Sequence, residues 1–505
     1  MSAESAKEGD SKGASVKEPQ PEARQAPPLA VGDDRRVILL PFGLSDHKHV
    51  EYALEEVSKL PDDVAKKTIR HTLELFGHRH KDLPKRLEQH CDEALHNVER
   101  VPDLDPARRQ LVGALLSMEY SIEAAALFNP SIVPHPDQTG LGADELRFVL
   151  SLRATGEGHV SSIVFRTGVI GANGEIHLDP PAAYAARAQL TPDQRFRKTL
   201  FRQKLADLDL NLNTADAVLE PLGEWFTLQD LEAAASSACA RQPGPDGVDQ
   251  AVSGILWLAQ SNYQLTLEEK DTDLSELVIY PRSEGESRGM EDLRLVRFED
   301  DDGTVQYYGT YTAFDGQRIL PMLLETQDFR RVAIHTLNGA CVQNKGMALF
   351  PRRIGGSYTM CGRIDGCNLY LMQSQMVHFW ETATLLAQPR YPWELRLIGN
   401  CGSPLETSEG WLLFTHGVGP MRRYCIGAML LDLEDPLRVR GRLREPLLEP
   451  GEAHREGYVP NVVYTCGALI HRDTVYLPYA VADTETHMAT IKLSDLLQRL
   501  LKDGP

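Results

Sequence analysis

The sequence predicts a mainly β protein, a five-bladed β-propeller interrupted by α-helical insertions. Short strands and turns fill almost the whole chain after residue 256. Within that part, strand–turn–strand units recur at intervals of about 50 to 60 residues, as expected for the blades of a propeller. Two segments with helical periodicity interrupt the earlier half of the chain. The alternative fold is a β-sandwich beside a helical domain.

Composition and periodicity divide the chain into six segments. The first is rich in Ser, Glu, Lys, Gly and Pro, which is typical of a disordered tail. The second contains the apolar run RVILLPF, which indicates a strand. The expected order is a disordered tail (1–33), a propeller strand (34–44), a helical insertion (45–127), a propeller blade (128–190), a second helical insertion (191–255) and the remaining blades (256–505).

The two insertions are predicted from apolar residues at three- and four-residue spacing, which place one apolar face on a helix. In the first insertion these residues are Val50, Ala53, Leu54, Val57 and Leu60. Residues 106–127 open on a proline and predict another helix. In the second insertion the periodic residues are Phe196, Leu200, Leu205 and Leu208.

The predicted blades alternate apolar and polar residues and break at turn-forming residues. The segments ELRFVLSLRAT and SSIVFRTGVIGANGEIHLDP show this pattern in the first blade. In the later blades the strand–turn–strand units pivot on Asp302-Gly303, Gly355-Gly356, Glu409-Gly410 and Arg472-Asp473.

Charge and composition exclude several classes of protein. The formal net charge of −19 argues against nonspecific nucleic-acid binding and against an anionic membrane surface. The sequence has no apolar run of 18 residues and no secretory signal at its start, and its eight cysteines form no CxxC pair. We therefore expect a cytoplasmic protein with reduced cysteines. No His/carboxylate cluster at ligand spacing is evident, so no metal is expected.

Polar residues recur near the ends of the strands that would surround the propeller axis. Because such strands converge, their terminal side chains are expected to meet in one pocket. The candidates are Asn129, Arg153, Asp292, Lys345, Arg363, His416 and Asp483.

These candidates form a chemically complete set for glycosyl transfer to phosphate. Lys345, Arg363 and His416 suit an oxyanion, because charge-assisted hydrogen bonds to phosphate are strong. Asp292 is the natural proton donor. An inverting glycosidase needs a second carboxylate to activate water, but bound phosphate is itself a nucleophile and needs no protein base.

The same residues lie in motifs that resemble glycoside hydrolase family 130, the β-mannoside phosphorylases and their hydrolytic relatives, which are five-bladed propellers. The matching stretches cover roughly residues 125–190 and 256–495, in the order of the family. They are LFNPSIVPHPD, GMEDLRLVRF, TYTAFDG, NKGMALFPRRIGGSY, PLETSEGWLLFTHGV, IGAMLLDLEDP and YVPNVVYTCGALI.

The resemblance assigns roles to individual residues. The Asp of the family's EDxR turn, the general acid, falls on Asp292, and Glu291 beside it is expected to have a supporting role. The proton is thought to pass through the 3-hydroxyl of mannose. The implied phosphate ligands are Lys345, Arg363 and His416, and the implied mannose ligands are Asn129, Arg153 and Asp483, with Tyr424 close by. Phosphate would be a co-substrate, and no other cofactor is implied.

Two positions depart from the family pattern. Phe314 stands where the family often has Tyr, and Glu406 stands where many phosphorylases have Lys. Glu406 makes an inverting β-mannosidase, with Asp292 as acid and Glu406 as base, the alternative function. A non-catalytic carbohydrate-binding propeller is a further alternative. If the chain is a phosphorylase, we expect Glu406 to turn away from the phosphate ligands, or to be neutralised by Arg422 or Arg423. The acceptor sugar, the linkage and any homo-oligomer are left open.

Overall fold

The computed structural model describes residues 23–505 except 26, 45, 97, 99–101, 192–193, 209–211, 242–246 and 268–271. Most of the tail expected at 1–33 therefore lies outside the described residues. The described part is mainly β, with nine α-helices. None of these helices is long and apolar enough to cross a membrane.

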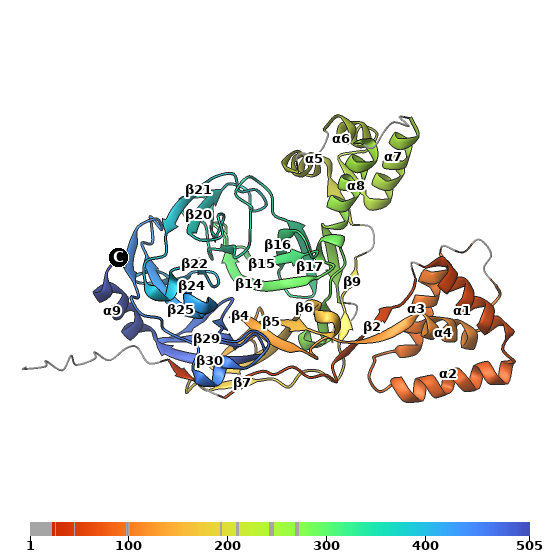
Figure 1. Cartoon of the computed structure of the whole chain (residues 1–505), viewed down its shortest axis with the longest axis horizontal. Coiled ribbons are helices and arrows are strands. Elements are labelled where there is room, and N and C mark those ends of the chain that lie inside the picture. Colours follow the sequence, from red (N-terminus) through yellow and green to blue (C-terminus); the bar gives the residue numbers. More distant parts are fainter. Residues whose placement is uncertain are drawn as a thin grey trace, which may run out of the picture.

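Most strands belong to five antiparallel groups that follow one another along the chain (Figure 1). Group 1 is β4 (Ala126–Pro134), β5 (Leu146–Thr155), β6 (Ser161–Ile170) and β7 (Ile176–Leu178). Group 2 is β14 (Gly289–Glu299), β15 (Val305–Phe314), β16 (Ile319–Thr326) and β17 (Arg331–Thr336). Group 3 is β18 (Ala348–Leu349), β19 (Tyr358–Gly362), β20 (Leu369–Ser374) and β21 (Ala383–Ala387).

Two further groups complete the set. Group 4 is β22 (Leu397–Asn400), β23 (Leu405–Thr407), β24 (Gly410–Val418), β25 (Tyr424–Leu431) and β26 (Val439–Arg442). Group 5 is β27 (Val463–Tyr464), β28 (Leu469–His471), β29 (Thr474–Val481) and β30 (Glu485–Lys492). Groups 1 and 2 share one twelve-stranded sheet, in which β6 pairs with β14. Shorter strands of this sheet are β8 (Ala186–Arg187), β9 (Gln189–Leu190), β12 (Tyr263–Thr266) and β13 (Leu277–Ile279).

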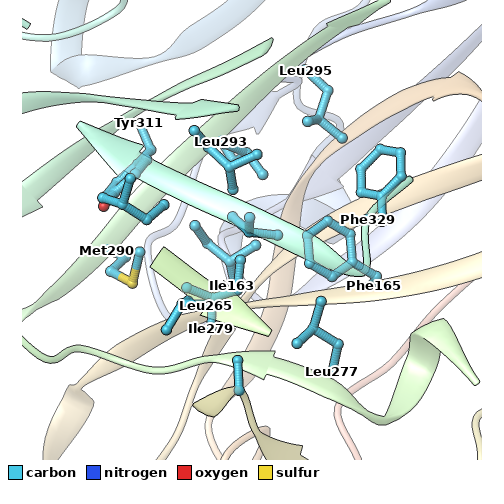
Figure 2. Close-up of a cluster of buried hydrophobic side chains, with 14 of the residues drawn as sticks. Ile163, Phe165, Leu265, Leu277, Ile279, Met290, Leu293, Leu295, Tyr311 and Phe329 are labelled. Carbon is cyan, nitrogen blue, oxygen red and sulfur yellow. The ribbon is translucent and has the colours of Figure 1, made fainter. Parts of the chain in front are cut away.

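Each group buries apolar side chains against the next. Phe165 of group 1 packs with Met290 and Leu295 of group 2 (Figure 2). Separate clusters of the same kind join groups 2 and 3 (Tyr308 with Met360), 3 and 4 (Leu371 with Trp411), 4 and 5 (Leu412 with Leu477), and 5 and 1 (Met488 with Phe148). The last of these clusters closes the series, so the five groups form a ring around a common centre (Figure 1).

Backbone hydrogen bonds also close the ring between its first and last groups. The Leu127 amide donates to the Thr484 carbonyl, and the Cys466 amide donates to the Pro130 carbonyl. The short strand β1 (Arg24–Gln25) pairs with the edge of β30. The prediction of disorder up to residue 33 is therefore wrong for this segment, because the unpaired edge of β30 gives its backbone hydrogen-bonding partners.

The first helical block contains α1 (His47–Lys59), α2 (Asp62–Phe76), α3 (Leu83–Leu95) and α4 (Pro106–Leu115). Its own core includes Val50, Leu54, Val57 and Val112. The helix predicted over 106–127 ends at Leu115, and β3 (Ser117–Ser121) follows. β3 pairs with β2 (Val37–Pro41) in a separate two-stranded sheet, so tertiary pairing decides the conformation of this segment.

The second helical block contains α5 (Lys198–Asp207), α6 (Leu212–Leu219), α7 (Leu228–Arg241) and α8 (Gly247–Gln260). It begins beside a small sheet of β10 (Arg195–Arg197) and β11 (Trp225–Thr227), and it also has its own core. The buried Lys204 of α5 joins this block to group 2. Its Nζ donates to Asn262 Oδ1 at 2.7 Å and lies 3.3 Å from the Thr336 carbonyl.

All four predicted pivots are turns in the structure. Gly303, with φ of 81°, joins β14 to β15, and Gly356, with φ of 77°, lies between β18 and β19. Gly410 begins β24, and Arg472 connects β28 to β29. A final helix, α9 (Leu493–Asp503), follows the strands and buries three leucines in the cluster between groups 4 and 5.

Candidate active site

Backbone irregularities in two strands position the central pair of polar side chains. Asp292 interrupts the register of β14 with β15, and Asn129 interrupts the register of β4 with β5. Both residues have a positive φ, 59° and 48° respectively, a conformation that Asp and Asn adopt more readily than most residues. A bulge re-aims a side chain that would otherwise follow the alternation of the strand. Here it directs the two side chains toward each other.

Asp292 lies at the centre of a dense polar network. Asn129 Nδ2 donates to Asp292 Oδ1 at 2.7 Å, and Arg153 Nη1 lies 3.4 Å from the same oxygen. Arg153 Nη2 also contacts Glu291 Oε1 at 3.1 Å, while Lys345 Nζ contacts Glu291 Oε2 at 3.3 Å. The structure therefore brings four of the predicted residues together, with Glu291 linking two of the cations.

Arg294 connects this network to a second one. Its Nη1 donates to the Asp292 carbonyl at 2.8 Å, and its Nη2 donates to the Tyr464 hydroxyl at 2.8 Å. The guanidinium is almost fully buried, and Nη2 lies 3.7 Å from Asp292 Oδ2. Arg294 thus holds both the backbone and the carboxylate of Asp292.

The second network contains the predicted phosphate ligands Arg363 and His416. Arg363 Nη1 lies 3.2 Å from His416 Nε2. The His416 ring packs edge-on against Tyr464 at 4.9 Å and is stacked with Tyr424 at 6.2 Å between centroids. Burial and the nearby Arg363 hold the pKa of His416 well below its usual value. This environment favours the neutral imidazole, so His416 would contact an oxyanion through a hydrogen bond rather than through a full positive charge.

Several buried polar atoms of these two networks have no hydrogen-bonding partner within the described part of the chain. They are Asn129 Oδ1, Arg153 Nε, Arg363 Nε and both side-chain amide atoms of Asn400. Buried polar groups without partners are rare in native proteins, and each calls for an explanation such as a bound ligand. Asn400 ends β22, which pairs with the β24 segment that carries His416. These atoms leave hydrogen-bonding capacity for water or for a polar ligand.

The two aspartates of the site differ in their protonation. Burial raises the pKa of Asp292, but Arg153, Arg294 and Lys345 outweigh it and hold the value below that of an ordinary Asp. Burial and the Asp292 charge raise the pKa of Asp483 to about 7. Like charges in one site favour protonation of only one member. In the protein without ligand, Asp292 is therefore the group that favours the ionised form, and Asp483 favours the protonated form at pH values below about 7.

The carboxylate of Glu406 contacts Arg352 and not the network around Asp292. Both of its oxygens accept hydrogen bonds from Arg352 at 2.9 Å. The pair lines a cavity of about 610 Å³ together with the later half of β14, whereas Asp292 lies in the earlier half of that strand. The expected neutralisation is present, but Arg352 provides it. Arg423 instead pairs with Glu449, at 3.1 Å.

Sequence reasoning missed three residues of the site: Arg294, Tyr464 and Asn400. Arg294 could have been identified from the sequence, because it lies in the matching stretch GMEDLRLVRF, two residues after Asp292. Tyr464 likewise lies in the matching stretch YVPNVVYTCGALI, whereas Asn400 lies outside all of these stretches and carried no comparable signal.

The fold and the site together define a class. A carboxylate beside buried guanidinium groups, in a mainly β ring with unpartnered polar atoms, is suited to carbohydrate chemistry with an anionic co-substrate. A family model described as beta-1,4-mannooligosaccharide phosphorylase matches residues 249–502. The chain therefore belongs to this family, glycoside hydrolase family 130.

Two relatives identified by sequence agree with this assignment. The chain is 34% identical over 234 residues to a 1,2-beta-oligomannan phosphorylase of Thermoanaerobacter sp. (strain X514), covering 44% of this chain and 75% of the relative. It is 30% identical over 249 residues to a beta-1,2-mannobiose phosphorylase of Listeria innocua, covering 48% and 67%. A solved beta-1,2-mannobiose phosphorylase from Listeria innocua, in complex with beta-1,2-mannobiose, has a TM-score of 0.44 at 22% identity, covering 75% of this chain and 93% of that one.

Proposed function

We propose that this protein is an inverting β-mannoside phosphorylase on a five-bladed β-propeller, with Asp292 as its general acid. Each antiparallel group would be one blade, which is supported by the closed series of cores between neighbouring groups. The observation that carries the function is the position of Asp292. It is held by Asn129 and Arg153 and is connected through Arg294 and Tyr464 to the Arg363–His416 pair.

In this proposal the mannosyl unit occupies the space beside Asn129, Arg153 and Asp483. Phosphate binds to Arg363, to the neutral His416 and to Lys345. A phosphate oxygen attacks the anomeric carbon as its bond to the glycosidic oxygen breaks. The proton of Asp292 passes to that departing oxygen, through the mannose 3-hydroxyl as the family resemblance implies. The products are α-mannose 1-phosphate and the shortened acceptor.

The protonation of Asp292 makes this step dependent on phosphate. In the protein without ligand, the surrounding cations keep its carboxyl ionised. Bound phosphate places negative charge beside these cations and so weakens their hold on the carboxylate. The pKa of Asp292 then rises, and the acid becomes protonated in the complex that reacts.

The contacts of Glu406 bear on the hydrolytic alternative. An inverting hydrolase needs a base across a water-sized gap of about 6.5–9.5 Å from the acid. Glu406 is engaged by Arg352 at the cavity beside the later half of β14. This arrangement favours phosphorolysis over hydrolysis with Glu406 as base.

Product analysis tests the proposal. The protein is incubated with β-1,2- and β-1,4-mannobiose, with and without inorganic phosphate, and mannose and mannose 1-phosphate are quantified. We expect mannose 1-phosphate to form only with phosphate, and mannose to be released from the acceptor side in equal amount. Release of two mannoses per disaccharide at full rate in phosphate-free buffer would establish the hydrolase instead.

A further inference from the structure

A cluster of metal-ligating side chains lies outside the candidate active site, in group 2 and the segment after β20. One potential ligand atom each from Glu325, His335 and His378 lies within 4.8 Å of the other two. Glu325 Oε1 is 2.7 Å from His378 Nε2 and 3.9 Å from His335 Nε2. Among the described residues, no other three His, Cys, Asp or Glu side chains meet in this way.

The fold assembles this cluster from residues that are far apart in the sequence. Strands β16 and β17 are antiparallel, and His335 pairs with Leu323, two residues from Glu325 on the same face of β16. His378 arrives from the segment after β20, where Phe379 bridges to Asn338. The sequence analysis expected no metal because no ligand spacing is visible along the chain. The antiparallel register of β16 and β17 places His335 near Glu325, a proximity that the spacing of residues along the chain does not reveal.

The donor set is one that binds metal ions in proteins. Two imidazoles and one carboxylate are the protein ligands of many zinc sites, in which a water completes a tetrahedron. In a tetrahedral zinc site, two ligand atoms lie about 3.3 Å apart, because each is about 2.0–2.1 Å from the metal. The separations of 2.7 and 3.9 Å from Glu325 lie on either side of that value. Side-chain shifts of well under 1 Å would bring both distances to about 3.3 Å.

The exposure of the cluster fits entry of an ion. The three side chains are 19 to 23% exposed, so they are half-buried and still open to solvent. Within the described part of the chain, the polar contact of His335 with Glu325 is too long for a hydrogen bond, and its ring meets His378 edge-on at 5.0 Å. A lone pair of His335 is therefore available to a ligand.

We propose that Glu325, His335 and His378 form a binding site for a divalent transition-metal cation, with Zn²⁺ as the best match. None of these residues contributes to the networks around Asp292 and Arg363, so the site is structural. It would fasten the segment after β20 to strands β16 and β17. Those strands also contact the second helical block through Lys204 and Thr336.

Lys204 is the group that opposes this assignment. Its ammonium lies close enough for its charge to act on both Glu325 and His335. It is held by Asn262 and Thr336 rather than by a direct contact with the carboxylate. If Lys204 is the natural counter-ion of Glu325, the protein binds no metal here. If the proposal holds, Lys204 weakens binding by repulsion without preventing it.

Metal titration of the full-length chain, purified without a polyhistidine tag and treated with a chelator, tests the site. We expect one equivalent of Zn²⁺ to bind by calorimetry, and Co²⁺ to give the visible absorption of a low-coordinate site with imidazole ligands. Zn²⁺ should also raise the melting temperature, since a ligand that binds only the folded state stabilises it. Absence of stoichiometric binding by the wild-type protein would overturn the proposal, and this readout needs no variant.

Matched variants locate the ion. His335→Gln and Glu325→Gln should each weaken Zn²⁺ binding at least tenfold, because each removes one of three ligands. His177→Gln changes a histidine that is 69% exposed and lies outside the cluster, and it should bind as the wild type does. Lys204→Met removes the neighbouring charge and should bind Zn²⁺ more tightly. Equal Zn²⁺ affinity in the wild type and His335→Gln would place the ion elsewhere and refute the assignment.

Discussion

The two halves of the candidate active site differ in how their charges are satisfied. Around Asp292, the protein itself provides the partners, with Asn129, Arg153 and Arg294 all in contact with one carboxylate. Around Arg363, the described partner is His416, and Arg363 Nε is buried without a partner. The charge of Asp292 is compensated by cations of the protein in the absence of ligand, whereas no ion pair of the described residues involves Arg363, so its charge is left for an anion.

In the proposed mechanism, this difference makes the two halves depend on each other. An acid that is held ionised by cations transfers no proton until those cations are offset. Phosphate in the second half would provide the offsetting charge. The comparison therefore predicts distinct effects for changes in each half, and the predictions below run from the largest expected effect to the smallest.

The largest effect is expected for Asp292→Asn. General acid catalysis typically contributes about 10²- to 10⁴-fold, so turnover of β-mannobiose should fall by that factor. Substrates with an activated aryl leaving group need less protonation and should lose much less. Turnover is measured by release of mannose 1-phosphate, with circular dichroism as a control for folding. A near-normal rate on the disaccharide would show that Asp292 is not the acid.

Arg363→Ala should act mainly on phosphate. A hydrogen bond to a charged group contributes about 1.5–3 kcal/mol, so the KM for phosphate should rise about 10- to 150-fold. The KM for the mannoside should change far less. Arg352→Ala is the matched control, because it removes a guanidinium from the cavity beside Glu406. Parallel losses for phosphate and mannoside in Arg363→Ala would indicate a structural role.

Asp483→Asn should stabilise the folded protein in a pH-dependent manner. The folded-state pKa of about 7 exceeds the ordinary value, so this carboxyl favours folding at low pH, and its contribution is lost as pH rises toward 7. A difference of about three pKa units corresponds to at most about 4 kcal/mol. Melting temperatures of variant and wild type, compared from pH 5 to pH 8, should diverge with rising pH. A constant difference would contradict the assignment.

Phosphate should shift the pH dependence of the reaction. If phosphate raises the pKa of Asp292, the alkaline limb of the rate profile should move upward by about one pH unit between low and saturating phosphate. The rates are measured at saturating β-mannobiose across pH 5 to 9. Identical profiles at both phosphate concentrations would mean that the two halves are not coupled electrostatically.

The smallest effect is expected for Glu406→Gln. Since both oxygens of Glu406 are bound by Arg352, phosphorolysis should change by less than about twofold, in the range of a partly exposed ion pair. Phosphate-free hydrolysis is followed in the same variant. Loss of a hydrolytic activity in Glu406→Gln would make this residue a base and reverse our preference.

Local patterns in the sequence determined much of the secondary structure of this protein and several residues of its candidate site. Glycines at three of the four pivots favour the hairpins, because a positive φ costs glycine little, whereas the fourth turn places Arg472 at a positive φ. Apolar spacing over residues 50–60 predicted a helix, which the structure confirms as α1. Asp292, Arg153 and Lys345 were singled out from short motifs, and they do lie in one network. The helix α9 was missed, although its leucines at 496, 497 and 500 carry a helical period.

Tertiary structure decided what depends on contacts between distant segments. Residues 117–121 form a strand because they pair with residues 37–41, which local propensity does not reveal. Burial, rather than residue type, lowers the pKa of His416 and raises that of Asp483 to about 7. Strand register places Glu325 beside His335, whereas contacts between separate segments bring Arg352 to Glu406 and His378 to Glu325. The spacing of residues along the chain determines local conformation. Which charged groups are buried together, away from water, depends on contacts between distant segments in the folded ring.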